Sequence, residues 1–297
     1  MNRSVRVMIE MNGKIKRTLA GPFLVLFFAA AAIVLHAVMP SPGAEMDASV
    51  FDSFLVKKLG FPAVASGYFI VLFFHILVTV RVFAPKSQLG KWKTGCCFGL
   101  AFSLLYLGGM QEVMVSASPL TEYGLDFVLY ELFLGLGDAL PAFLLCIALC
   151  LLHSAPAGFV RKTPFLHPAN GIRIAMIAAS FFVWRMVGYL TGIVDNELSQ
   201  YPIPVVVWTA AFGVLLGLGD CLMAPFFESS KRSKLVGLFL TIGVNWIWFN
   251  CYIGLIAAHT FGFMVLRAGA DVLAMLTGGF LAEQIILVQQ RKRAMDE

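Results

Sequence analysis

The sequence predicts an all-α integral membrane protein with eight transmembrane helices and both termini in the cytoplasm. Three observations predict this fold. The chain is 59% hydrophobic and only 13% charged, which is roughly half the charged content of a soluble domain. Eight apolar blocks are each long enough to cross a hydrocarbon core about 30 Å thick. Lysine and arginine collect in alternate connections between these blocks.

The blocks are continuously apolar rather than alternating, which favours helices over transmembrane strands. A helix satisfies its own backbone hydrogen bonds in lipid. The predicted spans are residues 19–39, 61–83, 96–116, 126–151, 173–194, 203–226, 235–258 and 271–290. Residues 50–59, in the first outer loop, have the pattern of a short amphipathic helix lying on the membrane surface.

The distribution of basic residues predicts the orientation. Eighteen of the 22 Lys and Arg residues lie before the first span, after the second, fourth and sixth spans, or in the tail. The opposite side holds only Lys57, Lys58 and Arg267, and Arg185 lies inside a span. This asymmetry places both termini in the cytoplasm of a cell membrane. The net charge of +5 is therefore a topology signal, and it does not indicate a nucleic-acid partner.

The loops divide the chain into five parts. These are a basic cytoplasmic N-terminus (1–18), a first four-helix membrane half (19–152), a Pro-rich cytoplasmic loop (153–172), a second four-helix membrane half (173–290) and a basic tail (291–297). The first span is longer than the apolar region of a typical signal peptide, and no clear small-x-small cleavage site follows it. We therefore expect an uncleaved anchor.

The phrase Leu-Gly-Leu-Gly-Asp occurs twice, at residues 134–138 and 216–220. Each copy lies in a predicted span that runs from outside to inside, and each is followed by a proline, Pro141 or Pro225. The offset of 82 residues is consistent with a duplicated helical hairpin. Because the two copies point the same way, such a repeat would be parallel and related by an axis along the membrane normal.

Ionisable groups within the spans are the main functional signal, because an ionised side chain at mid-membrane costs about 2.5–3.5 kcal/mol on insertion scales. Leaving aside the three residues at each end of every span, five carboxylates fall within the predicted spans, against a single arginine. They are Glu112, Glu131, Asp138, Asp220 and Glu283. The candidate substrate- or proton-binding residues are Asp138, Arg185, Asp220, Glu131, Glu283 and His75.

Counting from the span ends places Asp138 and Arg185 near the midplane, which predicts an ion pair between them. Glu131 shares the face of Asp138, because the two are seven residues apart. Asp220, Glu283 and His75 lie in the inner halves of their spans, where His75 can approach the two acids. Glu112 and His36 lie near span ends, where their polar groups can reach the interface.

The excess of carboxylates over cations favours a small-solute or proton-coupled carrier, because a desolvated acid without a cation favours its protonated form and can exchange protons. Pro141 and Pro225 weaken two helices at matching positions, which is typical of transport sites. Two other interpretations remain open. The groups can serve only packing, with Arg185 neutralising Asp138 and the glycines allowing close helix contact. The chain can also be a non-catalytic sensor or accessory subunit that acts through a protein partner.

The phrase Gly-Leu-Gly-Asp resembles the catalytic signature of the GxGD intramembrane aspartyl proteases, the presenilin and signal peptide peptidase group. The resemblance implies that Asp138 or Asp220 is a catalytic aspartate, since two carboxylates that share a proton can activate water. The rest of the chain departs from that pattern. It has no Tyr-Asp pair, it has eight predicted spans instead of nine, and Pro141-Ala142-Phe143 matches the family's Pro-Ala-Leu motif only in part. An enzymatic role is therefore the less favoured reading, and no catalytic residue is assigned.

The six cysteines lie in or at the ends of apolar blocks, which is typical of small core residues. The sequence contains no zinc motif and no Gly-rich phosphate loop. We therefore predict no metal and no cofactor. The predicted partners are the lipid bilayer and either a small-molecule or ion substrate or another protein.

Overall fold

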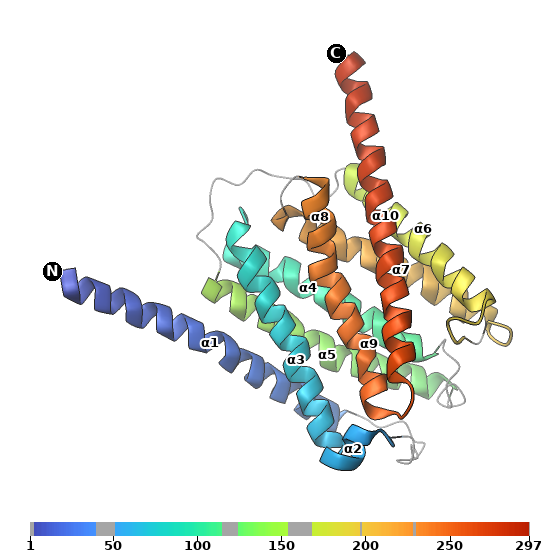
Figure 1. The fold of residues 1–297 in the computed structure, drawn as a ribbon, viewed down its shortest axis with the longest axis horizontal. Helices are drawn as coiled ribbons and strands as arrows, with labels where there is room; N and C mark the ends of the chain where they lie inside the picture. The colour runs from blue at the N-terminus through green and yellow to red at the C-terminus, as the bar shows by residue number, and fades with distance from the viewer. Residues whose placement is uncertain are drawn as a thin grey trace.

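The structure is a computed structural model that describes residues 3–39, 51–114, 124–153, 168–196, 198–227 and 230–296. These residues form helices and turns and include no β-strand (Figure 1). The helices of more than four residues are α1 (Arg3–Val38), α2 (Phe54–Leu59), α3 (Phe61–Phe83), α4 (Lys91–Met110), α5 (Gly124–His153), α6 (Pro168–Leu190), α7 (Pro202–Met223), α8 (Lys231–Leu238), α9 (Val244–Ile256) and α10 (Phe261–Asp296), with a π-helical turn, η6 (Phe239–Gly243), joining α8 to α9.

Seven helical segments of the described chain are long and apolar enough to cross a membrane. The fold is therefore compatible with a multi-pass membrane protein. The expected third span, residues 96–116, corresponds to α4 and the short 3-10 helix η3 (Gln111–Met114), and it is not among these seven. Lys91, Lys93 and four glycines lower the hydropathy of α4. The number of eight spans stays a prediction.

The glycines of α4 allow neighbouring helices to approach its backbone closely. A Cβ atom added to Gly95 would lie 2.8 Å from the Cα atom of Ile147 on α5. A Cβ atom added to Gly108 would lie 2.5 Å from a methyl group of Leu215 on α7. Small residues at helix contacts are how membrane helices pack tightly. The composition that makes α4 less apolar therefore also places it between α5 and α7.

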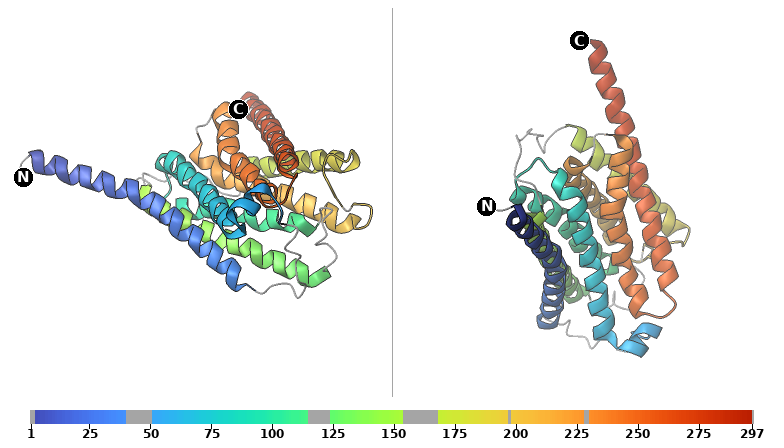
Figure 2. Two further views of the ribbon diagram at one scale, coloured as in Figure 1. Left: turned by 60° about the horizontal axis from the view of Figure 1, so that its bottom comes forward. Right: turned by 60° about the vertical axis from the view of Figure 1, so that its left-hand side comes forward.

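The remaining helices surround this centre. α6 packs against α7 and α10, α10 also packs against α9, and α1 packs against α5 and α3. The N-terminal part of α1 and the C-terminal part of α10 project away from the bundle (Figure 1), and the right-hand view of Figure 2 shows the same for α10. α10 begins at Phe261, ten residues before the predicted span at 271–290. This earlier start brings Arg267 into the helix, one turn before Asp271.

A short surface helix was expected at residues 50–59, and α2 forms within that range; residue 50 lies outside the described residues. The Ser53 hydroxyl caps α2 by accepting a hydrogen bond from the backbone N–H of Val56 at 3.0 Å. The same hydroxyl donates to the carbonyl of Leu255 at 2.6 Å. Ser53 thus fixes α2 to the end of α9 as well as capping it.

The two prolines that were expected to weaken helices at matching positions, Pro141 and Pro225, lie in different kinds of helical segment. Pro141 lies inside the continuous helix α5, whereas Pro225 lies in a 3-10 turn that follows α7. The main helical irregularity of the described bundle is the π-helical turn η6, which has no proline. Such turns are often found at functional sites.

The two Leu-Gly-Leu-Gly-Asp phrases occupy different registers in their hairpins. Gly135 on α5 lies against Leu107, the seventeenth residue of α4. Gly217 on α7 lies against Ile174, the seventh residue of α6. Both phrases permit a close helix crossing, but at different distances from the end of the preceding helix. The repeat in sequence therefore does not correspond to a repeated packing position.

Candidate functional site

The predicted ion pair between Asp138 and Arg185 is wrong. Arg185 on α6 donates from Nε to Asp271 Oδ1 at 2.5 Å and from Nη2 to Asp271 Oδ2. Its Nη1 atom donates to Glu112 Oε1 at 2.5 Å. Asp138 instead contacts His36 on α1. Arg185 therefore faces α10, whose first turns the hydropathy pattern excluded from the span.

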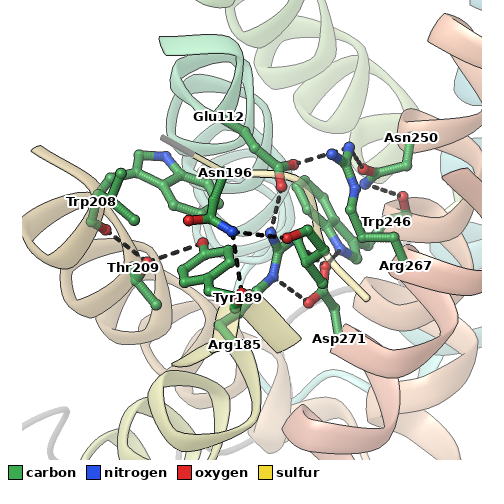
Figure 3. Close-up of polar contacts among 12 residues, drawn as sticks. Glu112, Arg185, Tyr189, Asn196, Trp208, Thr209, Trp246, Asn250, Arg267 and Asp271 are labelled. Carbon is green, nitrogen blue, oxygen red and sulfur yellow. Dashed lines mark hydrogen bonds and ion pairs between the residues drawn. The ribbon is translucent and has the colours of Figure 1, made fainter. Parts of the chain in front are cut away.

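Arg185 belongs to a buried group of four charged residues that we name the Arg185 cluster: Glu112, Arg185, Arg267 and Asp271 (Figure 3). Arg267 Nη2 lies 3.4 Å from Glu112 Oε2 and donates to Asn250 Oδ1 at 2.8 Å. The two arginines balance the two carboxylates, so the ionised cluster is neutral. Glu112 is 5% exposed and does not have the interfacial exposure expected from its sequence position.

Aromatic side chains complete the surroundings of the Arg185 cluster. Trp246 Nε1 donates to Asp271 Oδ2 at 3.0 Å. The Arg185 guanidinium lies 5.4 Å from the ring centroids of both Phe181 and Trp208, within cation–π distance. Figure 3 shows Trp246 beside Asp271 and the polar groups of several helices converging on Arg185.

A second group, the Arg173 cluster, comprises Arg173, Asp220, Lys234 and Glu283. Arg173 Nε donates to Asp220 Oδ2 at 2.7 Å, and Arg173 Nη1 donates to Glu283 Oε1. Lys234 Nζ donates to Glu283 Oε2 at 2.9 Å. Two cations again balance two carboxylates. One oxygen of Asp220, Oδ1, has no hydrogen-bond partner among the described residues.

Helices α6 and α10 each contribute residues to both clusters, so the alignment of these two helices links the clusters. Arg173 and Arg185 are twelve residues apart on α6, and Asp271 and Glu283 are twelve residues apart on α10. Twelve helical residues rise about 18 Å. Because the helices pack side by side and both arginine–carboxylate pairs form at once, α6 and α10 are antiparallel. Between the clusters, Ser180 Oγ donates to the carbonyl of Ala274 at 2.8 Å.

Sequence reasoning missed three members of these clusters. It counted Arg173 and Arg267 as loop residues and did not count Asp271 among the span carboxylates. In the structure Arg173 is 4% exposed, Arg267 6% and Asp271 4%. A charged residue lowers the mean hydropathy of the segment around it. A predicted span therefore ends near that residue even when it is paired in the folded protein. The available signal was the spacing of Arg267 and Asp271, which are four residues apart and share one helix face.

The third polar group, named here the Asp138 site, consists of His36, Glu131 and Asp138. His36 Nε2 lies 2.7 Å from Asp138 Oδ1, and the Asp138 side chain is 3% exposed. Glu131 is 4% exposed, its Oε2 atom has no hydrogen-bond partner among the described residues, and it lies seven residues, about two turns, before Asp138 on α5. The prediction that Glu131 and Asp138 share a region is thus supported by the structure. Neither forms a described contact with Lys or Arg.

His75 does not approach Asp220 or Glu283. Its Nε2 atom lies 2.9 Å from the carbonyl oxygen of Leu240, in η6. Its Nδ1 atom lies 3.1 Å from Nδ2 of Asn245, on α9. Of the predicted site residues, Asp138 and Glu131 are therefore in one group, Asp220 and Glu283 are in another, and Arg185 and His75 each have other partners.

The contacts of the two phrase aspartates bear on the protease resemblance. Asp138 is hydrogen-bonded to His36 and Asp220 to Arg173, so their described contacts do not form a carboxylate pair that shares a proton. No group of three or more His, Cys, Asp or Glu side chains among the described residues is arranged to hold a metal ion. Comparison with known proteins found no protein-family model, curated protein or solved structure that matches this chain.

The three groups differ in the protons they can exchange. In the Arg185 and Arg173 clusters each carboxylate faces guanidinium or ammonium groups, which keep their charge at physiological pH. Such clusters hold helices together without changing charge. In the Asp138 site the described hydrogen-bond partner of the carboxylate is the imidazole of His36, and no Arg or Lys contacts Asp138 or Glu131 among the described residues. The arrangement of this site is suited to proton binding.

Proposed function

We propose that the chain spans a cell membrane eight times with both termini in the cytoplasm, and that it is a proton-coupled carrier. The Asp138 site is the proposed proton-binding site. One observation carries the proposal: among the described buried carboxylates, Asp138 and Glu131 alone have no Arg or Lys partner, while Glu112, Asp220, Asp271 and Glu283 all have one.

The composition of the Asp138 site allows its net charge to change. The Glu131 and Asp138 carboxyl groups can each bind one proton, and they lie seven residues, about two turns, apart on α5. Each added proton offsets one negative charge in a region of low dielectric. A carrier uses such a change to link the binding of a proton to the binding or release of a second solute. A permanently ion-paired carboxylate is unsuited to that role.

The two ion clusters are the proposed closures on the two sides of the membrane. The orientation predicted from the basic loops puts the Arg173 cluster toward the cytoplasm and the Arg185 cluster toward the outside. The clusters lie about 18 Å apart along α6. Access from one side requires the cluster on that side to separate while the other stays closed. Relative movement of α6 and α10 at one end gives this result.

The experiment uses the full chain in proteoliposomes with the pH dye pyranine trapped inside. Gradients of Na⁺, K⁺, guanidinium, lactate, glycine and glucose are applied one at a time, with protein-free liposomes as the blank. We expect at least one solute to change the internal pH, and we expect Asp138→Asn and Glu131→Gln to abolish the change. Asp195→Asn, at an exposed carboxylate after α6, is the matched control and keeps it.

Two results would reject the proposal. One is an internal pH that follows the blank for every solute. The other is an unchanged proton flux in both Asp138→Asn and Glu131→Gln. The first result would favour the accessory or sensor role, in which the polar groups serve packing and the output passes through a partner.

A further inference from the structure

One helical segment, Lys231–Ile256, contacts both ion clusters. It consists of α8, η6 and α9, which follow one another beside α10 (Figure 1). In α8, Lys234 Nζ donates to Glu283 Oε2 of the Arg173 cluster at 2.9 Å. In the first turn of α9, Trp246 Nε1 donates to Asp271 Oδ2 of the Arg185 cluster at 3.0 Å. The π-helical turn η6 therefore lies between the contacts that this segment makes with the two clusters.

The same segment packs closely on α10 before η6 and at its end. A Cβ atom added to Gly279 on α10 would lie 3.3 Å from methyl groups of Leu235 and Leu238, in α8. A Cβ atom added to Gly243, the last residue of η6, would lie 3.1 Å from a methyl group of Val272 on α10. These contacts run antiparallel, and they fix which faces of α8 and of η6 point toward α10.

The hydrogen bonds of η6 show that it contains one residue more than a regular α-helical turn. The backbone N–H of Val244 donates to the carbonyl of Phe239, five residues earlier, where an α-helix would use the carbonyl four residues earlier. The Thr241 hydroxyl donates to the carbonyl of Gly237 at 2.8 Å. A side chain thus supplies a donor where the regular backbone pattern is interrupted.

His75, on α3, contacts two residues that have the spacing of a π-helical turn. Its Nε2 atom donates to the carbonyl oxygen of Leu240 at 2.9 Å, because that oxygen can only accept. Its Nδ1 atom lies 3.1 Å from Asn245 Nδ2. In a regular α-helix, residues five positions apart are turned about 140° from each other. The extra residue of the turn reduces this angle to about 40°, so that one imidazole reaches both residues.

The extra residue also aligns the two cluster contacts. Lys234 and Trp246 are twelve residues apart. In a regular α-helix, twelve residues would turn Trp246 about 120° away from Lys234. With one residue taken up by the π-helical turn, the rotation is that of eleven residues, about 20°. Both side chains therefore face α10. A segment without the turn can keep one of these contacts but loses the other.

We propose that η6 is the joint that lets the segment Lys231–Ile256 contact both ion clusters at once, and that its conversion to a regular α-helix releases one of them. The proposal rests on the carrier function, in which the clusters close opposite sides of the membrane in turn. Conversion rotates α8 against α9 by one residue's step, about 100°. This rotation withdraws either Lys234 from Glu283 or Trp246 from Asp271, so one cluster loses a contact while the other keeps its own.

Deletion of one residue tests the joint. Removal of Leu240, which is 44% exposed, leaves a regular α-helix in which the two cluster contacts keep their present facing. The matched control is removal of Ala179, an exposed residue of α6 midway between its two cluster arginines. Helix α6 has no π-helical turn to absorb that deletion, so one of its arginines turns away from its carboxylates.

Thermal unfolding of the purified full chain in detergent compares the two deletions. We expect the Leu240 deletion to unfold at a temperature no lower than that of the wild-type chain, because it keeps both contacts and loses the irregular turn. We expect the Ala179 deletion to unfold about 10 °C lower, as for loss of one buried ion pair.

A double-mutant cycle of Lys234→Met and Trp246→Phe measures whether η6 couples the two contacts. Substitutions this far apart normally have additive effects. Here we expect the double variant to lose more than the sum of the two single shifts in unfolding temperature. The reason is that loss of either contact lets the turn relax to a regular helix, and this relaxation can occur only once. In the Leu240 deletion, which has no turn to relax, the same cycle should be additive.

Three results would overturn the joint. They are a Leu240 deletion that unfolds as low as the Ala179 deletion, an additive cycle in the wild-type chain, and a folded Leu240 deletion that keeps full solute-driven proton flux in proteoliposomes. Failure of the carrier function looks different. If no solute drives flux in the wild-type chain, the carrier function fails, and the unfolding results alone decide whether η6 couples the clusters. If the wild-type chain shows flux and the folded Leu240 deletion loses it, both proposals stand.

Discussion

Arg185 on α6 donates two hydrogen bonds to the carboxylate of Asp271 on α10, and twelve residues along each helix Arg173 donates one hydrogen bond to Glu283 across the same two helices. A shift of one helix by a single turn would break both contacts together. The two pairs therefore set the register of α6 against α10 at two depths. Packing of apolar side chains alone would specify that register less strictly.

Removing Arg185 should destabilise the protein strongly. Arg185→Met leaves Asp271 and Glu112 buried without that cation, and loss of one partner of a buried ion pair costs about 3–5 kcal/mol. Arg232→Met, at an exposed arginine, should change stability little. Thermal unfolding of both variants in the same detergent, followed by circular dichroism, measures the difference. Equal unfolding temperatures would contradict a stabilising role for the Arg185 cluster.

Gly278 and Gly269 provide a matched pair of substitutions on α10. A Cβ atom at Gly278 would lie 2.6 Å from the Cα atom of Ile177 and from the carbonyl oxygen of Met176 on α6, whereas a Cβ atom at Gly269 meets nothing within 4 Å. Gly278→Ala should destabilise the α6–α10 contact by about 1–3 kcal/mol, as overpacking does. Gly269→Ala should be neutral or stabilising. A reversed order in chemical or thermal unfolding would argue against this helix contact.

Orientation is tested by labelling single cysteines in intact cells with a membrane-impermeant maleimide. Asp195→Cys, after α6, should react from outside, and Arg291→Cys, near the end of α10, should react only after the membrane is opened. The unsubstituted chain gives the background from its own six cysteines. Labelling of Arg291→Cys in sealed cells would reverse the proposed topology.

Asp52 should make the junction between α2 and α9 sensitive to acid. Its Oδ1 atom accepts a hydrogen bond from the backbone N–H of Ala258 at 2.9 Å, and this bond lowers the pKa of Asp52 below its ordinary value of 3.8. A lowered pKa means that the contact stabilises the fold above the ordinary pKa and is lost as the pH falls through the lowered one.

Limited proteolysis of the loop before α2 measures this effect as the pH is lowered. We expect cleavage of the wild-type chain to increase only once the pH falls below 3.8. Asp52→Asn should remove that dependence and show the same cleavage throughout. An acid-active protease such as pepsin is suited to this range. A wild-type profile identical to that of Asp52→Asn would show that the contact is absent in solution.

The sequence predicted helices well where apolar runs were uninterrupted. The predicted span 61–83 coincides with α3, whose run starts after Gly60 with Pro62 in its first turn. The start of α10 was missed because Arg267 interrupts the apolar run before the predicted span, although it is paired in the fold. The partner of Asp138 was missed for another reason. His36 is 102 residues away and reaches it only because α1 packs on α5.

The π-helical turn could not be predicted either. Residues 239–243 have no proline and continue an apolar run, so their local pattern is that of an ordinary helix. The orientation of Asn245 depends on this turn and on His75 from a distant helix. Local sequence patterns therefore identified most of the ionisable residues of the two ion clusters and the Asp138 site. The partners of these residues depend on tertiary packing.

The central claim is that the Asp138 site exchanges protons with water while the ion clusters do not. Infrared difference spectroscopy of the full chain between about pH 5 and about pH 8 measures it most directly, because a protonated carboxyl group has its own carbonyl band. We predict a buried carboxyl band that is lost in Asp138→Asn or Glu131→Gln and kept in Asp195→Asn. A spectrum without that band, or with the band unchanged in both site variants, would contradict the account.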